Sequence, residues 1–348
     1  MFSQLLELIR QPLAPSCKLF AGSAALLLVA TTAPFSQAAG IAPADIERVL
    51  GEAHKQFSAV KDGANADYIP ALDEVNSELF SISLVTPDGR VYDVGDSNYT
   101  FSIQSISKAF IAAKVIETEG ADAMLEQIGV DATGAPFNSI KAIERIDERS
   151  VNPLVNAGAM ASVSMLKADS PEAKWNLILG TLEEFAGRKL TVMEDIYESE
   201  AATNDRNQAI AKLLEAYGRL YDDVDSTVDL YTRQCSVGVT SHDLAVMAGT
   251  LASGGTNPVT GKQVVKEDNV PEVLAIMATA GLYDDSGIWL YNVGLPAKSG
   301  VGGGIVAVAP GQYGIAAFSP RLDQAGNSVR AQLAIEYIVE QLGGNVFE

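Results

Sequence analysis

A serine and a lysine three residues apart, Ser105 and Lys108, form the pair in this chain best suited to nucleophilic catalysis. Residues i and i+3 of a helix lie on one face, so the hydroxyl and the amine can meet there. An amine that loses proton affinity through burial can accept the hydroxyl proton and activate the oxygen. Ser105 also lies where an extended segment passes into an apolar helix, and the backbone N–H groups at a helix start favour a developing oxyanion. We therefore predict Ser105 as a nucleophile.

Two other Ser-x-x-Lys patterns occur, Ser58 with Lys61 and Ser164 with Lys167. Both lie inside helical patterns, away from a strand-to-helix junction, and we expect them on helix surfaces. The position of Ser105 at such a junction distinguishes it from these two serines.

Lys298-Ser299-Gly300 precedes a strand-like segment, VGGGIVAVAP, and adds weight to Ser105. A Ser-x-x-Lys followed far downstream by Lys-Ser/Thr-Gly on a strand is the signature set of serine penicillin-recognising enzymes and class A β-lactamases. There the strand backbone lines the cleft and supplies an oxyanion donor. The glycine run 300–304 permits a close approach of backbone to ligand.

The elements that must position these residues change along the chain. A helical pattern follows Ile41, and residues 79–94 read as a hairpin with its turn at Pro87-Asp88-Gly89. Residues 106–240 show helical periodicity and no convincing strand. Two strands return around Pro310-Gly311, and the last helix is expected to start at an Asn cap, Asn327, and to stop at Gly343.

A lone hairpin is marginal in water, so the strands of both chain ends must meet in one sheet. The predicted fold is α/β (α+β) and β-lactamase/penicillin-binding-protein-like. Its mixed α/β lobe comprises residues 39–105 with 240–348, and residues 106–239 form an inserted all-helical lobe. A ligand cleft between the two lobes is expected.

The composition excludes several classes of function. The 348 residues carry 24 Lys and Arg against 44 Asp and Glu, a formal net charge of −20, without a run of five basic residues. Nucleic-acid binding is therefore not expected, because it needs clustered cations. Two His, His54 and His242, and two Cys, Cys17 and Cys235, show no metal-ligand spacing, so we predict neither a metal nor a cofactor.

The N-terminus carries an apolar run, residues 19–35, after Arg10 and Lys18 and before the small-x-small sequence Ser36-Gln37-Ala38. The run is short for a membrane span, which needs about 20 apolar residues. We interpret residues 1–38 as a signal peptide cut near Ala38, which predicts a periplasmic or secreted protein without a stable membrane anchor. A cytoplasmic location is the alternative.

Seven stretches in order make the sequence resemble the serine-dependent, β-lactamase-like glutaminases, over about residues 66 to 330. The matching stretches are Ala66–Pro70, Phe101–Lys108, Asn152–Ala159, Glu198–Glu200 with Asp205–Asn207, Asp229–Tyr231 with Cys235–Ser236, Gly281–Asp284 and Val293–Ile305.

The resemblance implies hydrolysis of the side-chain amide of L-glutamine, with release of ammonia through a glutamyl ester on Ser105. It implies that Lys108 activates Ser105, that Tyr283 shuttles a proton, and that the N–H groups of Ser105 and Val301 form an oxyanion hole. It further implies a substrate pocket of Tyr68, Asn156, Glu200, Asn207 and Tyr231, and a homo-oligomer, either a dimer or a tetramer. Glu200 is the natural partner of the substrate α-ammonium, because a free amino acid carries one cation.

Two alternatives stay open. The Ser-Lys pair could serve an exported penicillin-recognising hydrolase, against which the set Tyr68, Glu200, Asn207 and Tyr231 stands. The scaffold could also bind glutamine without turnover, as a non-catalytic sensor.

Overall fold

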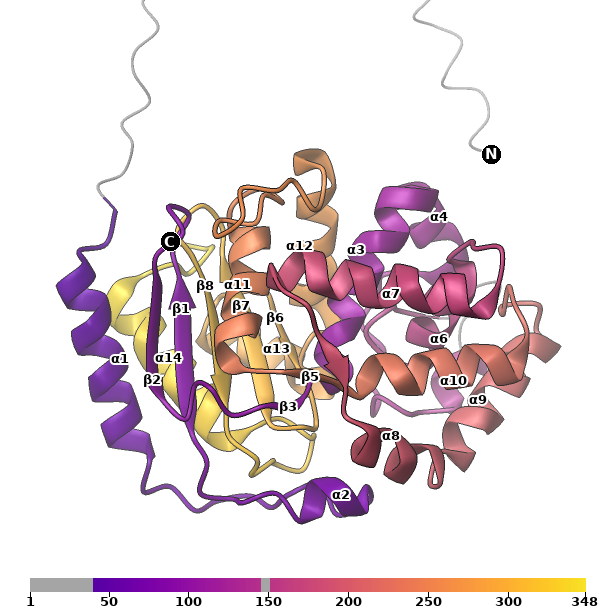
Figure 1. Cartoon of the computed structure of the whole chain (residues 1–348), viewed down its shortest axis with the longest axis horizontal. Helices are drawn as coiled ribbons and strands as arrows, with labels where there is room; N and C mark the ends of the chain where they lie inside the picture. The colour runs from indigo at the N-terminus through magenta and orange to yellow at the C-terminus, as the bar shows by residue number, and fades with distance from the viewer. Residues whose placement is uncertain (1–39, 145–150) are drawn as a thin grey trace, which may run out of the picture. The chain divides into compact units, whose positions relative to one another are not determined.

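A five-stranded antiparallel sheet joins the two ends of the chain in the computed structural model, which describes residues 40–144 and 151–348 (Figure 1). The strands are β1 (Ser81–Val85), β2 (Val91–Gly95), β6 (Ala297–Ser299), β7 (Gly304–Ala309) and β8 (Tyr313–Phe318), in the order β2-β1-β8-β7-β6. The register pairs Ser83 with Ala316 at the junction of the early and late strands. The predicted hairpin and the predicted meeting of both ends are thus confirmed.

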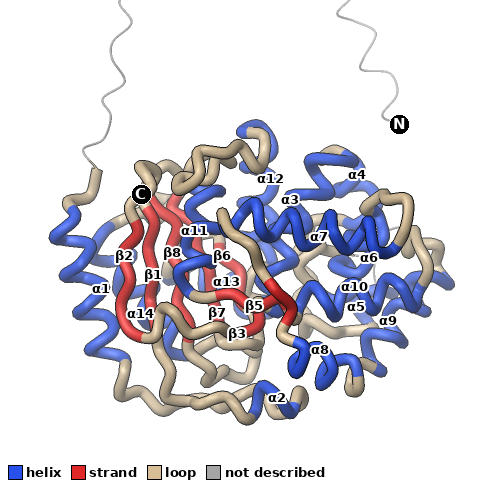
Figure 2. The backbone as a smooth tube through the Cα atoms, in the orientation of Figure 1, coloured by secondary structure: helices blue, strands red, loops and turns tan. Residues whose placement is uncertain are grey.

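Both faces of this sheet are covered by helices, which explains why β7 and β8 are continuous apolar runs (Figure 2). Ile315 and Ala317 face one hydrophobic cluster with helices α1 (Pro43–Phe57) and α14 (Val329–Leu342). Ala316 and Phe318 point the other way, into a cluster that includes α11 (Ser241–Ala252). The alternation along β7 and β8 therefore buries every side chain of these two strands, which lie at the centre of the fold.

Helices dominate the part of the chain between the early and late strands. They are α2 (Pro70–Asp73), α3 (Ser107–Glu119), α4 (Ala121–Ala123), α5 (Lys141–Glu144), α6 (Asn156–Met165), α7 (Pro171–Ala186), α8 (Glu194–Ala201), α9 (Asp205–Ala216) and α10 (Val224–Cys235), and later α12 (Val270–Ala280) and α13 (Ser286–Asn292). Helix α3 is buried on nearly all sides and packs against α6, α7 and α12. This burial anchors the segment that carries Ser105.

A second, small sheet corrects the prediction that residues 106–240 contain no strand. Strands β3 (Phe101–Ser102), β5 (Val237–Val239) and β4 (Thr191–Val192) pair in the order β3-β5-β4. Strands of two or three residues are too short to show a period of two, so the sequence pattern does not reveal them. This sheet ties the segment just before Ser105 to the end of α10.

The start of the last helix is a second correction. The N-cap of α14 is Ser328, whose side chain accepts a hydrogen bond from the N–H of Ala331, and Asn327 lies one residue earlier. The helix ends at Gly343, as predicted. Residues 41–348 form one compact unit, and the division into two lobes at residues 105 and 240 stays a prediction. The interpreted signal peptide, residues 1–38, lies outside the described residues.

Candidate active site

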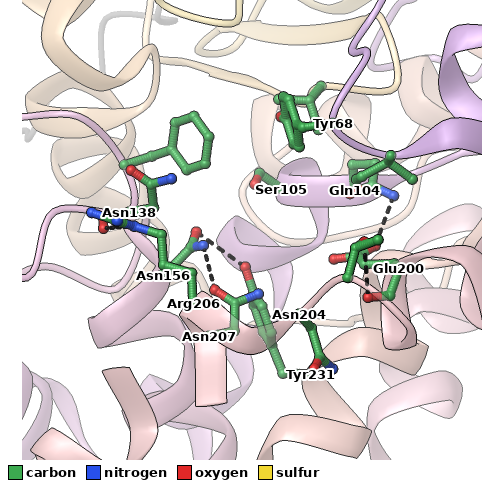
Figure 3. A pocket seen from close by; sticks show the side chains of 14 residues that line it. Tyr68, Gln104, Ser105, Asn138, Asn156, Glu200, Asn204, Arg206, Asn207 and Tyr231 are labelled. Atoms are coloured by element: carbon green, nitrogen blue, oxygen red, sulfur yellow. Dashed lines mark hydrogen bonds between the residues drawn. The ribbon is translucent and has the colours of Figure 1, made fainter. Parts of the chain in front are cut away.

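A cavity of about 270 Å³ lies where the segment around Ser105 meets helices α6, α8, α9 and α10 (Figure 3). Seven of the nine residues predicted for the site line it: Tyr68, Ser105, Asn156, Glu200, Asn207, Tyr231 and Val301. The other two, Lys108 and Tyr283, lie directly behind it, where Lys108 bonds to Asn156 and Tyr283 contacts Ser105. The structure therefore brings together all nine residues, which come from segments far apart in the chain.

Ser105 lies in a single 3-10 turn, Gln104–Ile106, which leads into α3. The turn begins with an unusual backbone, because Gln104 has a φ of 48°, a conformation that side-chain-bearing residues rarely adopt. Such strain persists only where the surroundings hold the residue in place, and it is concentrated at functional sites. The sharp turn leaves Ser105 on the cavity wall with only 6% of its surface exposed.

Lys108 is fully buried behind the cavity, and its Nζ donates a hydrogen bond of 2.7 Å to Asn156 Oδ1. The amine also lies 5.6 Å from the centroid of the Tyr231 ring. Burial lowers the pKa of Lys108 to about 8, so about a tenth of the amine is neutral at pH 7 and about half at pH 8. We expected this amine to bond to Ser105, but the hydrogen bond in the structure goes to Asn156. A neutral amine that donates there keeps its lone pair available.

Asn156 is the centre of a polar chain that crosses the cavity floor. Its Oδ1 accepts from Lys108 and, at 3.2 Å, from the Tyr231 hydroxyl, and its Nδ2 donates to Asn207 Oδ1 at 2.9 Å. Because each bond fixes the orientation of the next group, Asn156, Asn207 and Tyr231 present a defined set of donors and acceptors to a ligand (Figure 3).

Glu200 is the buried carboxylate of the cavity, with 8% of its surface exposed. Burial raises the pKa of Glu200 to about 7, against a smaller lowering by the hydrogen bond that Gln104 Nε2 donates to Oε2 at 3.2 Å. A carboxylate that is half protonated at neutral pH is poised to ionise fully when a cation arrives beside it. The arrangement suits a ligand that carries an ammonium group.

The backbone N–H groups of Ser105 and Val301 donate no hydrogen bond to any residue in the described ranges 40–144 and 151–348. Both residues are buried and line the cavity. The glycine run explains why Val301 comes so close, since a Cβ on Gly300 would lie 2.9 Å from the carbonyl oxygen of Ile103 and one on Gly302 only 2.5 Å from that of Ser102. The run thus permits close approach to the nucleophile segment. Two free donors on the cavity wall are the arrangement required of an oxyanion hole.

Tyr283 lies behind the cavity, next to Ser105. Its hydroxyl donates a hydrogen bond of 3.4 Å to the carbonyl oxygen of Ser299, and the nearby Ser105 side chain lowers the pKa of Tyr283 slightly against the effect of burial. Its φ is 58°, the second strained backbone at the site, and its ring packs on Phe137 at a centroid distance of 5.0 Å. Burial raises the pKa of Tyr283, which keeps the hydroxyl protonated and able to donate.

Tyr68 differs from the other site residues because half of its surface is exposed. Together with Phe137 it lines both the cavity and a neighbouring open groove of about 620 Å³. Tyr68 therefore stands between the cavity and solvent.

Several lining residues were not predicted as site residues: Ile69, Gln104, Phe137, Asn138, Thr203, Asn204 and Arg206. Of these residues, Gln104 offers the clearest signal in the sequence, because it directly precedes the nucleophile. A polar residue at that position must face either the cavity or the buried interior. Arg206 contacts the site through its bond to the carbonyl oxygen of Asn138 at 2.8 Å, which only the folded chain reveals.

The other Ser-x-x-Lys patterns take no part in the cavity lining. Ser58 lies at the end of α1, whereas Ser164 is buried inside α6, contrary to the expected surface position, and bonds to the carbonyl oxygen of Ala161. Across residues 40–144 and 151–348, no three His, Cys, Asp or Glu side chains gather as a metal site. The same ranges contain no helix long and apolar enough to span a membrane.

Comparison with known proteins identifies relatives of this chain. A family model described as Glutaminase matches residues 63–347. A glutaminase of Colwellia psychrerythraea is 55% identical over 302 residues, which are 87% of this chain and 97% of the relative. A solved structure of a probable glutaminase, ybaS, matches with a TM-score of 0.87 and 46% identity, over 88% of this chain and all of the other. A probable glutaminase from Bacillus subtilis, complexed with 6-diazo-5-oxo-L-norleucine, matches with a TM-score of 0.77 and 30% identity, over 87% and 96%.

Proposed function

This chain belongs to the glutaminase family and is a glutamine amidohydrolase, and we propose that it acts through a covalent glutamyl ester on Ser105. The β-lactamase-like fold predicted from the sequence is confirmed by the solved glutaminases that it matches. The observation that carries the proposal is the pairing, on one cavity wall, of the Ser105 hydroxyl with two free backbone N–H groups.

In the acylation step, Ser105 Oγ attacks the side-chain amide carbon of glutamine. Neutral Lys108 takes the Oγ proton, and the former carbonyl oxygen, now negative, accepts hydrogen bonds from the N–H groups of Ser105 and Val301. The C–N bond then breaks, and the leaving nitrogen takes a proton from the Tyr283 hydroxyl, which is reprotonated from Lys108. Ammonia leaves, and each donor in this wall is worth about 10²–10³ in rate.

In the deacylation step, a water molecule adds to the ester carbon and gives up its proton to Lys108. The same two N–H groups hold the negative oxygen. The bond from the carbon to Ser105 Oγ then breaks, Oγ takes the proton back from Lys108, and L-glutamate leaves. Both steps use the same groups in turn, so the cavity needs only one nucleophile and one proton route.

Substrate recognition falls mainly to the side chains that helices α6, α8, α9 and α10 supply to the cavity, which form its recognition wall. Glu200 is the partner of the α-ammonium, because it is the buried carboxylate of the cavity and ionises fully beside a cation. The amides of Asn156 and Asn207, with the hydroxyls of Tyr68 and Tyr231, offer donors to the α-carboxylate. The Bacillus subtilis relative, solved with 6-diazo-5-oxo-L-norleucine, supports a site shaped for an amino acid of this length.

The deciding experiment measures ammonia release from L-glutamine by the full chain and by the Ser105→Ala variant, with a chromogenic cephalosporin as a second substrate. We expect ammonia from glutamine only with the unaltered chain, and no turnover of the cephalosporin. Isothermal titration should show that Ser105→Ala still binds glutamine. Cephalosporin turnover would transfer the same Ser-Lys chemistry to a penicillin-recognising enzyme. Glutamine binding without turnover by the unaltered chain would indicate a sensor.

We further propose that the protein is exported, with residues 1–38 removed near Ala38. The support is the apolar run at residues 19–35, with basic residues before it and small residues after it. Mass spectrometry of the protein from the periplasmic fraction should give a mature start at residue 39 or 40. An intact N-terminus in the cytoplasmic fraction would contradict export.

We also propose a homo-oligomer, a dimer or a tetramer, on the basis of the family resemblance. Light scattering coupled to size-exclusion chromatography measures the mass directly. A mass near 36.7 kDa for the full chain would mean a monomer and contradict the proposal.

A further inference from the structure

A second fully buried lysine, Lys298, lies on β6 and does not line the cavity. The proposed reaction assigns it no role, although it belongs to the Lys-Ser-Gly motif. Its Nζ donates to the carbonyl oxygen of Gly281 at 2.9 Å and to that of Ser299 at 2.6 Å. It also lies 4.1 Å from the centroid of the Tyr283 ring. Lys298 therefore contacts the ring of Tyr283 and two backbone carbonyls close to it.

These contacts match the protonated form of the side chain. An ammonium has three donors and no acceptor, and two carbonyl oxygens and an aromatic face are three acceptors. Within the described residues Lys298 has no carboxylate partner. The titratable groups that face it are Lys108 and the neutral thiol of Cys235, and burial, together with the charge of Lys108, lowers the pKa of Lys298. A buried charge held only by carbonyls and a ring is costly, which argues that its position serves the reaction.

The two carbonyl oxygens that Lys298 binds both belong to backbone close to Tyr283. The Gly281 carbonyl lies two residues before Tyr283, and the Ser299 carbonyl also accepts from the Tyr283 hydroxyl at 3.4 Å. The backbone of Gly281 is docked on β6, since its carbonyl accepts from the Ser299 N–H at 3.1 Å. Tyr283 itself keeps a φ of 58°, which only a surrounding of this kind maintains.

We propose that Lys298 is a positioning residue for Tyr283, holding the ring from beneath so that the phenolic hydroxyl stays at Ser105. The inference rests on the proposed proton transfer by Tyr283. Lys298 does not line the cavity and acts through Tyr283 alone. Its loss therefore slows the chemical step and leaves the recognition wall of Glu200, Asn156 and Asn207 unchanged.

The test is a double-mutant cycle on ammonia release from glutamine, with Lys298→Gln, Tyr283→Phe and the combined variant. Gln keeps amide donors for the two carbonyls but removes the charge. We expect Lys298→Gln to lower kcat by about 10²-fold, as a misplacement of about 1 Å does, with KM changed less than about threefold. In the Tyr283→Phe background, the same substitution should lower kcat by less than about threefold, because the group it positions is gone.

A matched control is Lys174→Gln. Lys174 is also a buried lysine, with 5% exposure, but it bonds to Asp222 and to the Ser164 carbonyl, away from the cavity. This variant should lose thermal stability and keep the kcat and KM of the unaltered chain. A loss of kcat in both lysine variants would mean a general cost of removing a buried charge and would overturn the proposal.

Two further outcomes would also overturn it: a kcat of Lys298→Gln within about threefold of the unaltered chain, or effects of the two substitutions that multiply. If Lys298→Gln does not fold, the same cycle is made with Lys298→Met, for which the same results are expected. A failure of the proposed reaction looks different, because Tyr283→Phe would then keep full kcat.

Discussion

The two walls of the cavity are built in different ways. The reaction wall contains Ser105 and Val301, with Tyr283 directly behind it. These three residues owe their positions to the backbone: a 3-10 turn, a glycine run and a positive φ. On the other wall, four helices each supply one side chain to the polar surface, namely Asn156, Glu200, Asn207 and Tyr231. Regular helices hold the recognising groups, and irregular backbone holds the reacting ones.

The difference teaches where tolerance to substitution should lie. A reacting atom must stay within a fraction of an ångström of its position, whereas a hydrogen bond to a bound substrate can be lost singly at a modest cost. Changes to the reaction wall should therefore appear in kcat, and changes to the recognition wall in KM.

The largest effect is expected from Gly302→Ala on the reaction wall. The added Cβ would lie 2.5 Å from the Ser102 carbonyl oxygen, so the loop must move and take the Val301 N–H with it. We expect kcat to fall by about 10²–10³-fold, the value of one oxyanion donor, with little change in KM. Steady-state kinetics with glutamine measures both. Gly51→Ala in α1, where a Cβ meets nothing within 4 Å, is the control and should leave kcat unchanged. A rise in KM with an unchanged kcat would contradict the expectation that changes to the reaction wall appear in kcat.

Glu200→Gln is the matching change on the recognition wall. It removes the charge that pairs with the α-ammonium, so KM should rise by about 10–10²-fold, the equivalent of roughly 1.5–3 kcal/mol, while kcat changes less. Glu198→Gln, an exposed residue on the same helix, is the control. A fall confined to kcat would place Glu200 among the reacting groups.

The same variant should be more stable than the unaltered chain. Burial raises the pKa of Glu200 from 4.5 to about 7, so the folded state binds the proton more tightly than the unfolded state does. The stabilisation from this group is present below pH 4.5 and is lost as the pH rises toward 7. Glu200→Gln should therefore raise the midpoint of thermal unfolding at pH 8 and have little effect at pH 4. An equal gain at both pH values would contradict this account.

The pH dependence of kcat/KM should distinguish the two walls, because Glu200 and Lys108 titrate at different pH values. Each group should change kcat/KM by about tenfold per pH unit below its own pKa. Below pH 7, kcat/KM should fall as Glu200 takes up a proton and loses the charge that binds the substrate. A second limb should rise through about pH 8, where Lys108 becomes neutral and can act as a base. Glu200→Gln should remove the limb near pH 7 and keep the one near pH 8. Profiles of kcat and kcat/KM between pH 5 and 10 test both limbs.

The smallest effect is expected from Tyr231→Phe, which removes one hydrogen bond to Asn156 and leaves the ring in place. The loss of one neutral hydrogen bond of about 0.5–1.5 kcal/mol corresponds to a two- to tenfold rise in KM. Tyr197→Phe on the neighbouring α8, whose hydroxyl bonds to Asp229 outside the cavity, should have no kinetic effect. A loss of kcat beyond tenfold would assign the Tyr231 hydroxyl to the reaction.

Much of the fold follows from local sequence patterns. The hairpin of β1 and β2, the late strands and the helical centre all show their period in the sequence, and the sheet that joins the chain ends follows from the instability of a lone hairpin. The small sheet of β3, β4 and β5 does not, because two or three residues cannot display a period. Ser328 as the cap of α14 was missed because Asn327 beside it is an equally good capping residue.

The sequence predicts which residues form the site but not how they bond to one another. The positions of the nine predicted residues follow from the ordered motifs, which no single residue would have identified. That Lys108 bonds to Asn156, that Gln104 contacts Glu200, and that Tyr283 has a positive φ all depend on how distant segments meet. Such facts belong to tertiary packing, which local propensity does not encode.

The pairing of β1 with β8 also has a consequence for the order of events during biosynthesis. The central strand of the main sheet, β8, is synthesised long after Ser105, and Val301, the proposed second oxyanion donor, precedes β8 only shortly. Contacts between such distant parts of a chain form slowly. A nascent chain thus carries its nucleophile long before the rest of the site exists, and hydrolysis of glutamine begins only after β8 has been synthesised and has paired with β1.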